Sequence, residues 1–166
     1  MRLPATLLVL LLSTTAHAEP LCGALGSPAP ELKHISRGFS HGHTGLDMMA
    51  PFGSPIRAAA GGTVVYAGWY YAYGNIIDIQ HADGVITRYA HMAGFAPGIR
   101  DRQPVAAGQV IGQVGQTGNA HGPHVHFEVR LNGRPVDPRP FLAGTACATR
   151  PLIEEARVPE PRRRRH

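Results

Sequence analysis

The sequence predicts a single all-β domain that is built on a mostly antiparallel sheet and can fold into a sandwich. Glycine and proline are frequent, with 20 and 15 residues respectively in a chain of 166. Signals for helix starts are weak, and short apolar runs rich in β-branched residues recur between turn residues. A chain of this length suits one domain with a real hydrophobic core.

Five runs are expected to form strands because each combines β-branched or aromatic residues with turn residues at its ends. These strands are residues 63–67, 75–80, 85–90, 110–114 and 124–130. The aromatic stretch 69–73 is expected to be a loop after a strand. Its rings either pack internally or form the wall of a ligand-binding groove.

The last predicted strand carries two histidines one residue apart. Side chains alternate along a strand, so His124, His126 and Glu128 are expected on one face and Val125 and Phe127 on the other. Two imidazoles on a polar face, backed by an apolar face, indicate a metal site or an acid–base site. For so short a motif, a pair of surface histidines remains the alternative.

A second pair of candidate ligands lies upstream, in the segment HTGLD that begins at His43 and ends at Asp47. Gly45 disfavours a helix and prolines follow closely, so a strand or an extended loop is expected. Residues four apart share a face in a strand as well. Together with the His-x-His segment, this pair completes the nitrogen and oxygen set that zinc favours. Three protein ligands with one open position are typical of catalytic zinc.

Three motifs therefore follow one another along the chain: His-x-x-x-Asp, an isolated His91 in TRYAHM, and His-x-His. The stretches LDMMAP, AAGGTVV, YGN and GPHVHFE accompany them. This combination resembles the lysostaphin/LytM-type zinc metallopeptidases, which cut peptidoglycan peptides, and the resemblance covers residues 34–143. It implies the all-β fold of that family.

The resemblance also implies a role for each site residue. The zinc ligands fall on His43, Asp47 and His126, and the fourth position of the single ion is left for water or a substrate oxygen. The catalytic histidines fall on His91 and His124, which would move protons and stabilise the developing oxyanion. The expected function is a zinc metalloendopeptidase, a hydrolase acting on cross-links or stem peptides of peptidoglycan.

Two other functions are consistent with the resemblance. A non-catalytic relative would bind the cell wall and activate other peptidoglycan hydrolases, but such members lack ligands that this chain keeps. A zinc peptidase of general or self-processing specificity is the second alternative. The sequence does not decide which peptide bond is cut. Links between D-alanine and a diamino acid are preferred, with glycine bridges as the alternative.

The chain departs from the family in one respect. Only residues 38–42 separate the first core strand from the His-x-x-x-Asp segment, whereas many relatives have a longer insertion there. In some relatives a tyrosine from this region stabilises the transition state, and no clear counterpart exists here. Arg37 or His41 are candidates for its place. His41 also competes as a ligand, but its spacing of six residues to Asp47 favours His43.

The first residues have the pattern of a secretory signal peptide, assigned to residues 1–18. A short basic start precedes the apolar run 7–12, and the tripeptide AHA at 16–18 fits the cleavage signature, so the mature chain would begin at Glu19. The apolar run is too short to span a bilayer, and no later segment qualifies. The protein is therefore expected to be exported, either periplasmic or secreted.

The remaining chain is divided into an N-terminal extension (19–33), the zinc peptidase domain (34–147) and a tail (148–166). Cys22 and Cys147 lie near the edges of that domain, and in an oxidising compartment a disulfide between them is expected. Closing such a long loop contributes about 4–5 kcal/mol in the chain-entropy model. Two unpaired thiols are the alternative.

The basic character of the chain lies in its tail. The formal net charge is +5, and the six arginines and three glutamates from Arg150 onward contribute +3 of it. Prolines and a lack of apolar residues predict a disordered tail. Its terminal cluster is a candidate for contact with anionic envelope polymers or lipids, and export argues against nucleic acid; a solvated tail without a partner is the alternative. The cluster comprises Arg162, Arg163, Arg164 and Arg165.

Overall fold

A computed structural model of the protein describes residues 25–143. The predicted signal peptide (1–18), Cys22, Cys147 and the tail (148–166) lie outside the described residues. The signal sequence, the disulfide and the disorder of the tail therefore stay predictions.

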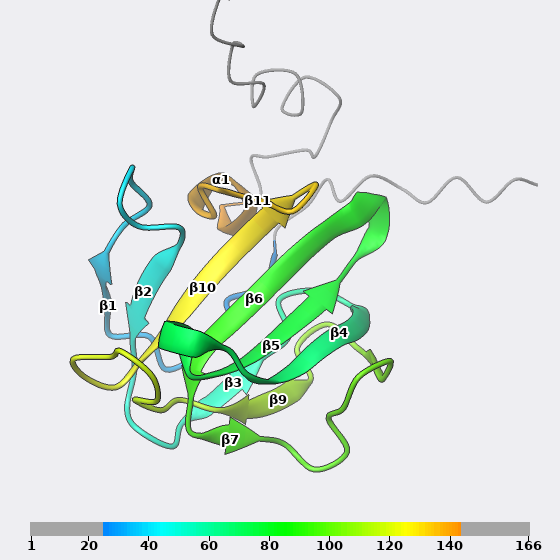
Figure 1. The fold of residues 1–166 in the computed structure, drawn as a ribbon, viewed down its shortest axis with the longest axis horizontal. Helices are drawn as coiled ribbons and strands as arrows, with labels where there is room; N and C mark the ends of the chain where they lie inside the picture. The colour runs from blue at the N-terminus through cyan, green and yellow to red at the C-terminus, as the bar shows by residue number, and fades with distance from the viewer. Residues whose placement is uncertain (1–24, 144–166) are drawn as a thin grey trace, which may run out of the picture.

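The described residues form two antiparallel sheets, a large one and a small one that lies beneath one end of it (Figure 1). The order in the large sheet is β1-β2-β10-β6-β5-β4-β8, with β11 paired to β10, and the order in the small sheet is β3-β9-β7. The strands are β1 (His34–Arg37), β2 (Leu46–Met49), β3 (Pro55–Arg57), β4 (Gly62–Trp69), β5 (Asn75–Gln80), β6 (Val85–Met92), β7 (Gly94–Phe95), β8 (Pro104–Val105), β9 (Val110–Gln113), β10 (His124–Leu131) and β11 (Arg134–Val136). The helical turns are η1 (Tyr71–Tyr73), η2 (Ala82–Gly84) and α1 (Arg139–Leu142).

The prediction of an all-β, mostly antiparallel domain is confirmed. All five predicted strands form, as β4, β5, β6, β9 and β10. The remaining strands have two to four residues, too few to show a clear alternation in the sequence. The prediction that residues 69–73 form a loop is partly wrong. Trp69 still pairs with Asn75 at the end of β4, and the residues between them close a tight connection through η1.

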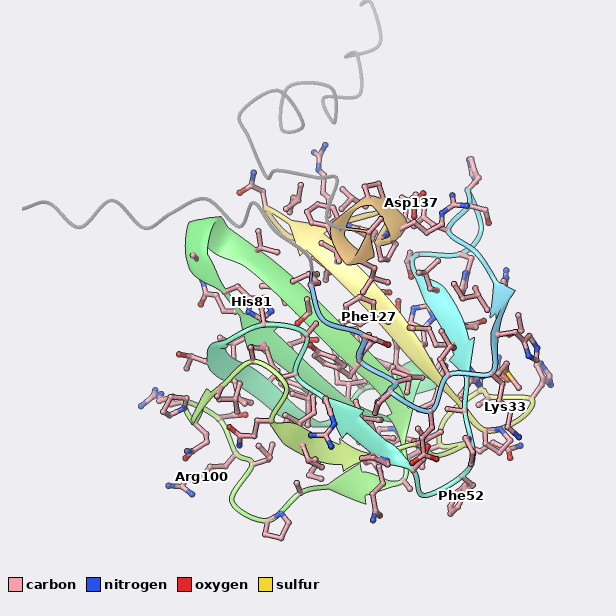
Figure 2. All side chains as sticks on the ribbon, turned by 180° about the vertical axis from the view of Figure 1, so that it is seen from behind. Lys33, Phe52, His81, Arg100, Phe127 and Asp137 are labelled. Carbon is pink, nitrogen blue, oxygen red and sulfur yellow. The ribbon has the colours of Figure 1, made fainter. Side chains whose placement is uncertain are left out.

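The hydrophobic core lies between the two sheets. Val125 and Phe127 on the inner face of β10 are fully buried, as are Ile56 of β3 and Ile111 of β9. The Phe127 ring lies 5.4 Å from the ring of Tyr89 on β6. Figure 2 shows Phe127 within the mass of interior side chains. The alternation predicted for β10 is confirmed, because its apolar residues face this core while its histidines line a pocket.

The topology places three strands that are distant in sequence side by side at the centre of the large sheet. β10 lies between β2 and β6, where His126 pairs with Asp47 on one side and with Ala90 on the other. The approach of β2 to β10 requires glycine at position 45. A Cβ there would lie 2.3 Å from the carbonyl oxygen of Phe127, a distance that side chains do not adopt. This accounts for the glycine inside the HTGLD segment.

The core position of Phe127 generates a stability prediction. Phe127→Ala should lower the free energy of unfolding by about 3–5 kcal/mol, because it removes a buried ring and leaves a cavity. Phe52→Ala is the matched control, since that side chain is 65% exposed, and it should have little effect. Urea unfolding of both variants is the measurement, and equal stability of the two would contradict the packing described.

Candidate metal centre

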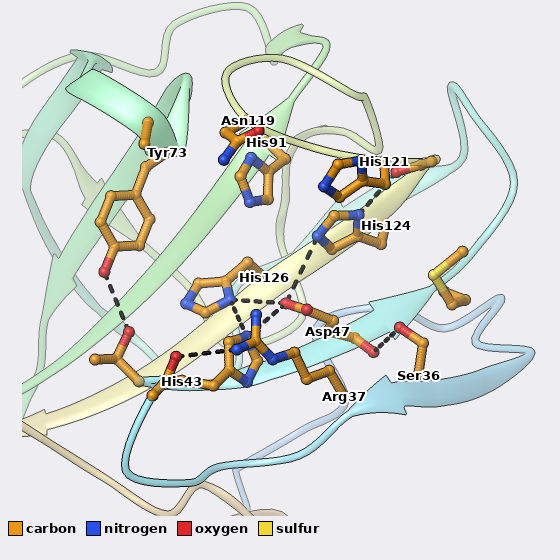
Figure 3. Close-up of a pocket in the computed structure, with 15 residues that line it drawn as sticks. Ser36, Arg37, His43, Asp47, Tyr73, His91, Asn119, His121, His124 and His126 are labelled. Atoms are coloured by element: carbon orange, nitrogen blue, oxygen red, sulfur yellow. Dashed lines mark hydrogen bonds and ion pairs between the residues drawn. The ribbon is translucent and has the colours of Figure 1, made fainter.

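Three potential ligand atoms converge at the junction of β2 and β10 (Figure 3). Asp47 Oδ1 lies 3.0 Å from His43 Nε2 and 2.8 Å from His126 Nδ1, and the two nitrogens are 3.1 Å apart. His43 precedes β2, Asp47 lies within it, and His126 projects from the neighbouring strand. In a tetrahedral zinc site the donor atoms lie about 3.3 Å apart, close to these separations.

The hydrogen bonds on the far side of each imidazole test whether this group fits a metal ion. His43 Nδ1 lies 2.8 Å from the carbonyl oxygen of Gly38, and His126 Nε2 lies 3.1 Å from Glu128 Oε1. Each of these oxygens can only accept, so either imidazole, when neutral, donates outward and turns a lone pair inward. Two lone pairs and a carboxylate oxygen then face one another at hydrogen-bonding distance. A cation between them removes this repulsion, so the donor set fits a zinc ion.

The titration behaviour of the site points in the same direction. Burial lowers the pKa of His126, but hydrogen bonds to Asp47 and Glu128 outweigh it and hold the pKa above its ordinary value. Burial raises the pKa of Asp47, but the hydrogen bond from His126 and the nearby imidazoles together lower it by more, so the pKa lies below its ordinary value. Both shifts mean that the site favours positive charge beside a negatively charged Asp47, carried either by a proton on His126 or by a metal ion.

Glu128 supports the candidate ligand His126 from behind. Its carboxylate is fully buried and accepts hydrogen bonds from Thr44 Oγ1 and, at 2.8 Å, from Tyr73 Oη. Arg130 forms an ion pair with its other oxygen. Burial raises the pKa of Glu128, but the hydrogen bonds from His126, Thr44 and Tyr73 lower it to about 2. A charged carboxylate therefore orients the His126 ring, as carboxylates behind metal-bound histidines commonly do.

A β-bulge turns His91 toward the same site. Tyr89 of β6 pairs with Ile77 of β5, and Met92 pairs with Asn75. Between these two pairs β6 therefore contains one residue more than β5. The φ angle of His91 is 60°, in the left-handed region that side chains other than glycine rarely adopt. Bulges of this kind often re-aim a side chain beside an active site. The ring that results lies 4.7 Å from that of His124, measured between centroids.

His91 and His124 both line the pocket, and each ring is held by a hydrogen bond to a backbone carbonyl. His91 Nδ1 donates to the carbonyl oxygen of Thr117 at 2.8 Å, and His124 Nδ1 donates to that of Gly122 at 2.8 Å. Burial lowers the pKa of His91 to about 4, so this imidazole is neutral at pH 7. His124 Nε2 lies 3.6 Å from Asp47 Oδ1. Two further imidazoles, one of them neutral at pH 7, therefore border the group of candidate ligands.

All five residues singled out from the sequence line one pocket of about 730 Å³. Arg37 also lines it, whereas His41 is exposed and does not. Of the aromatic stretch 69–73, the described pocket wall includes Tyr73 but not Trp69. The full lining is Ser36, Arg37, Gly42, His43, Thr44, Asp47, Met49, Ala72, Tyr73, His91, Asn119, His121, Gly122, His124 and His126.

Sequence reasoning missed part of this site. Glu128 was expected on the same face as His126, and the two-residue period of the strand was the signal that could have assigned it as a support. The contacts of Tyr73 and Thr117 had no such signal, because each depends on how a loop folds back on the sheet. Asn119 lines the pocket but likewise had no signal in the sequence, because it lies on the loop before β10.

The sequence and the fold match known peptidases. The sequence model of a protein family, described as Peptidase family M23, matches residues 41–138 of this chain. The chain is 48% identical over 96 residues to "DD-carboxypeptidase/endopeptidase Mpg" of Neisseria meningitidis serogroup B, and 38% identical over 95 residues to "Peptidoglycan DD-endopeptidase ShyA" of Vibrio cholerae serotype O1. These alignments cover 58% and 57% of the chain. The chain spans 22% of the length of either relative.

Two solved structures share the fold. A zinc-containing peptidase from Vibrio cholerae superposes with a TM-score of 0.65 at 28% identity, covering 77% of this chain and 40% of the other. The antimicrobial peptidase lysostaphin from Staphylococcus simulans superposes with a TM-score of 0.63 at 28% identity, covering 76% and 55% respectively.

The contacts of Glu128 generate a prediction about metal affinity. Glu128→Gln keeps the shape of the side chain but removes the charge behind His126, so zinc binding should weaken by about 10–100-fold. Competition with a chromophoric chelator measures this affinity. Asp137→Asn is the matched control, because Asp137 forms an ion pair with Arg139 at the start of α1, and neither residue lines the pocket. The support role is wrong if both variants bind zinc as tightly as the unmodified protein.

Proposed function

Because the chain belongs to peptidase family M23, we propose that it is a zinc metalloendopeptidase that hydrolyses peptide cross-links or stem peptides of peptidoglycan. The observation that carries the proposal is one pocket containing two imidazole nitrogens and a carboxylate oxygen close together, with two further imidazoles beside them. A purely structural metal site would have no need of the last two groups. Their presence favours catalysis over the non-catalytic wall-binding alternative.

His43, Asp47 and His126 would hold one zinc ion. When bound, zinc supplies Lewis-acid chemistry, polarising a scissile carbonyl and making water nucleophilic near neutral pH. Three protein donors leave a position open for water or substrate, as in other catalytic zinc sites. The outward hydrogen bonds to Gly38 and Glu128 orient the two ligand rings before the ion arrives.

His91 and His124 would handle the protons. Each ring is held by a hydrogen bond from Nδ1 to a backbone carbonyl, which leaves Nε2 free to accept a proton from the attacking water. The imidazolium that forms can stabilise the negative charge on the substrate oxygen by hydrogen bonding. The same proton can then pass to the departing amine nitrogen. Because the rings are adjacent, either can accept this proton, and the ring that accepts it is the one that later donates it.

The preferred substrate bond joins D-alanine to a diamino acid. The relatives Mpg and ShyA carry DD-carboxypeptidase and DD-endopeptidase in their names, which supports this preference over glycine bridges. Export remains a proposal based on residues 1–18. Within residues 25–143, no helix is long and apolar enough to cross a membrane. Contact of the tail with anionic envelope material likewise remains a proposal.

Digestion of purified sacculi tests the proposed function. The zinc-loaded protein should release soluble muropeptides, and a chelator should stop the release until zinc is restored. His91→Ala should keep its zinc, because His91 is not a ligand, but should lose at least about a hundredfold in rate, the scale of a positioned acid–base group. His41→Ala is the control, since this exposed histidine lies outside the pocket lining.

Three results would contradict the proposal. Binding to sacculi without any release of muropeptides would favour the non-catalytic alternative. Cleavage of unrelated proteins at similar rates would favour a general peptidase. Normal turnover by His91→Ala would remove His91 from the mechanism.

A further inference from the structure

We propose that Arg37 binds a free α-carboxylate on the substrate residue that supplies the amine of the scissile bond. The pocket would then select peptides whose leaving residue carries that carboxylate. This inference rests on the proposed function, because it describes the substrate of the same pocket.

The strand register places Arg37 beside the candidate metal ligands. Arg37 ends β1, where it is the antiparallel partner of Asp47 on β2. Residues directly opposite each other in such a pair project to the same face of the sheet. Both side chains accordingly line the pocket, together with His43 (Figure 3). A substrate group held by Arg37 would thus lie close to the bond that the site attacks.

The charges of the pocket wall leave Arg37 available for an anion. Arg37 is the one arginine or lysine in the described pocket lining, and Asp47 is the one acidic residue. Asp47 already faces His43 and His126. A divalent ion in the site would make the pocket still more positive. Long-range attraction therefore favours a negatively charged substrate.

The hydrogen bonds of Arg37 leave most of its donors unused. Nη2 donates to the carbonyl oxygen of Gly42 at 3.0 Å, and within residues 25–143 Arg37 forms no ion pair. Arg88 and Arg130, by contrast, are each paired with a carboxylate. A guanidinium has five N–H donors in a planar fork that matches a carboxylate in a bidentate pair. A carboxylate is therefore the group that Arg37 is best suited to recognise.

The chemistry of an amide bond decides which substrate residue carries this carboxylate. The residue on the carbonyl side has its own carboxyl group in the bond that is cut. When that residue is alanine, which has no second carboxyl group, a free α-carboxylate adjacent to the bond can thus belong only to the residue on the amine side. This residue is either the C-terminal residue of a peptide or a diamino acid linked through its side-chain amine. An internal glycine of a glycine bridge has no such carboxylate, so the inference excludes it as the preferred leaving residue.

Two matched peptides test the inference. Both contain D-alanine linked to the side-chain amine of a diamino acid, and the adjacent carboxylate is free in one and amidated in the other. Binding to the zinc-loaded full chain is measured by calorimetry in a His91→Ala background, which should slow turnover at least about a hundredfold. Cleavage rates are measured separately with His91 present. Arg37→Ala and Arg37→Lys are compared with Arg57→Ala, because Arg57 also is a strand-end arginine that donates to a glycine carbonyl, that of Gly108.

The free peptide should bind at least about tenfold more tightly than the amidated one, as expected for a charge-assisted bidentate pair. Arg37→Ala should remove this preference by weakening only the free peptide, Arg37→Lys should retain part of it, and Arg57→Ala should retain all of it. Zinc content should be unchanged in all three variants. A carboxylate bound by the metal ion alone would leave the preference intact in Arg37→Ala, which would overturn the inference.

Other outcomes separate this inference from the proposed function. If Arg37→Ala weakens both peptides equally, Arg37 only supports the loop that holds His43, and the inference fails. It also fails if neither peptide binds. Cleavage of both peptides with no effect of Arg37 would refute the inference and leave the proposed function standing. Selective binding through Arg37 without cleavage would refute the proposed catalysis alone.

Discussion

Asp47 Oδ1 lies at hydrogen-bonding distance from one nitrogen of each of two imidazole rings, and the rest of the site depends on this arrangement. When both imidazoles are neutral, hydrogen bonds among these three atoms cannot satisfy their lone pairs. The acceptors behind the two rings, Gly38 and Glu128, already take the available protons. The protein therefore holds a set of electron donors that favours a positive charge between them, and most other contacts in the pocket keep this set in place.

The large sheet supplies the rigidity for this arrangement. β10 carries His124 and His126 on one face and is anchored by apolar residues such as Phe127 on the other. The glycine at position 45 allows β2 to approach β10 closely enough for Asp47 to reach its partners. His91, by contrast, reaches the pocket through an irregularity of the sheet. The bulge in β6 interrupts the regular strand pairing and directs the His91 ring into the pocket. Its unusual backbone conformation is maintained by contacts with Thr117 on both its main chain and its ring.

Much of this could be predicted from the sequence because it depends on local periodicity. The alternation along residues 124–130 predicted which side chains of β10 share a face, and turn residues delimited the longer strands. The grouping of His43, Asp47, His91, His124 and His126 followed from a family resemblance, and the structure brings these residues into one pocket. What escaped prediction depends on long-range geometry. The support of His126 by Tyr73 through Glu128 needs the folded position of η1, and the bulge at His91 leaves no mark in the residue pattern.

The central claim is that His43, Asp47 and His126 form the metal centre while His91 and His124 remain free of the metal. Anomalous diffraction at the zinc edge from crystals of the zinc-loaded protein tests it most directly. The account predicts a single strong peak about 2.0–2.2 Å from His43 Nε2, Asp47 Oδ1 and His126 Nδ1, with both other rings still hydrogen-bonded to their carbonyl oxygens. A peak coordinated by His91 or His124, or no peak at the three donor atoms, would contradict it.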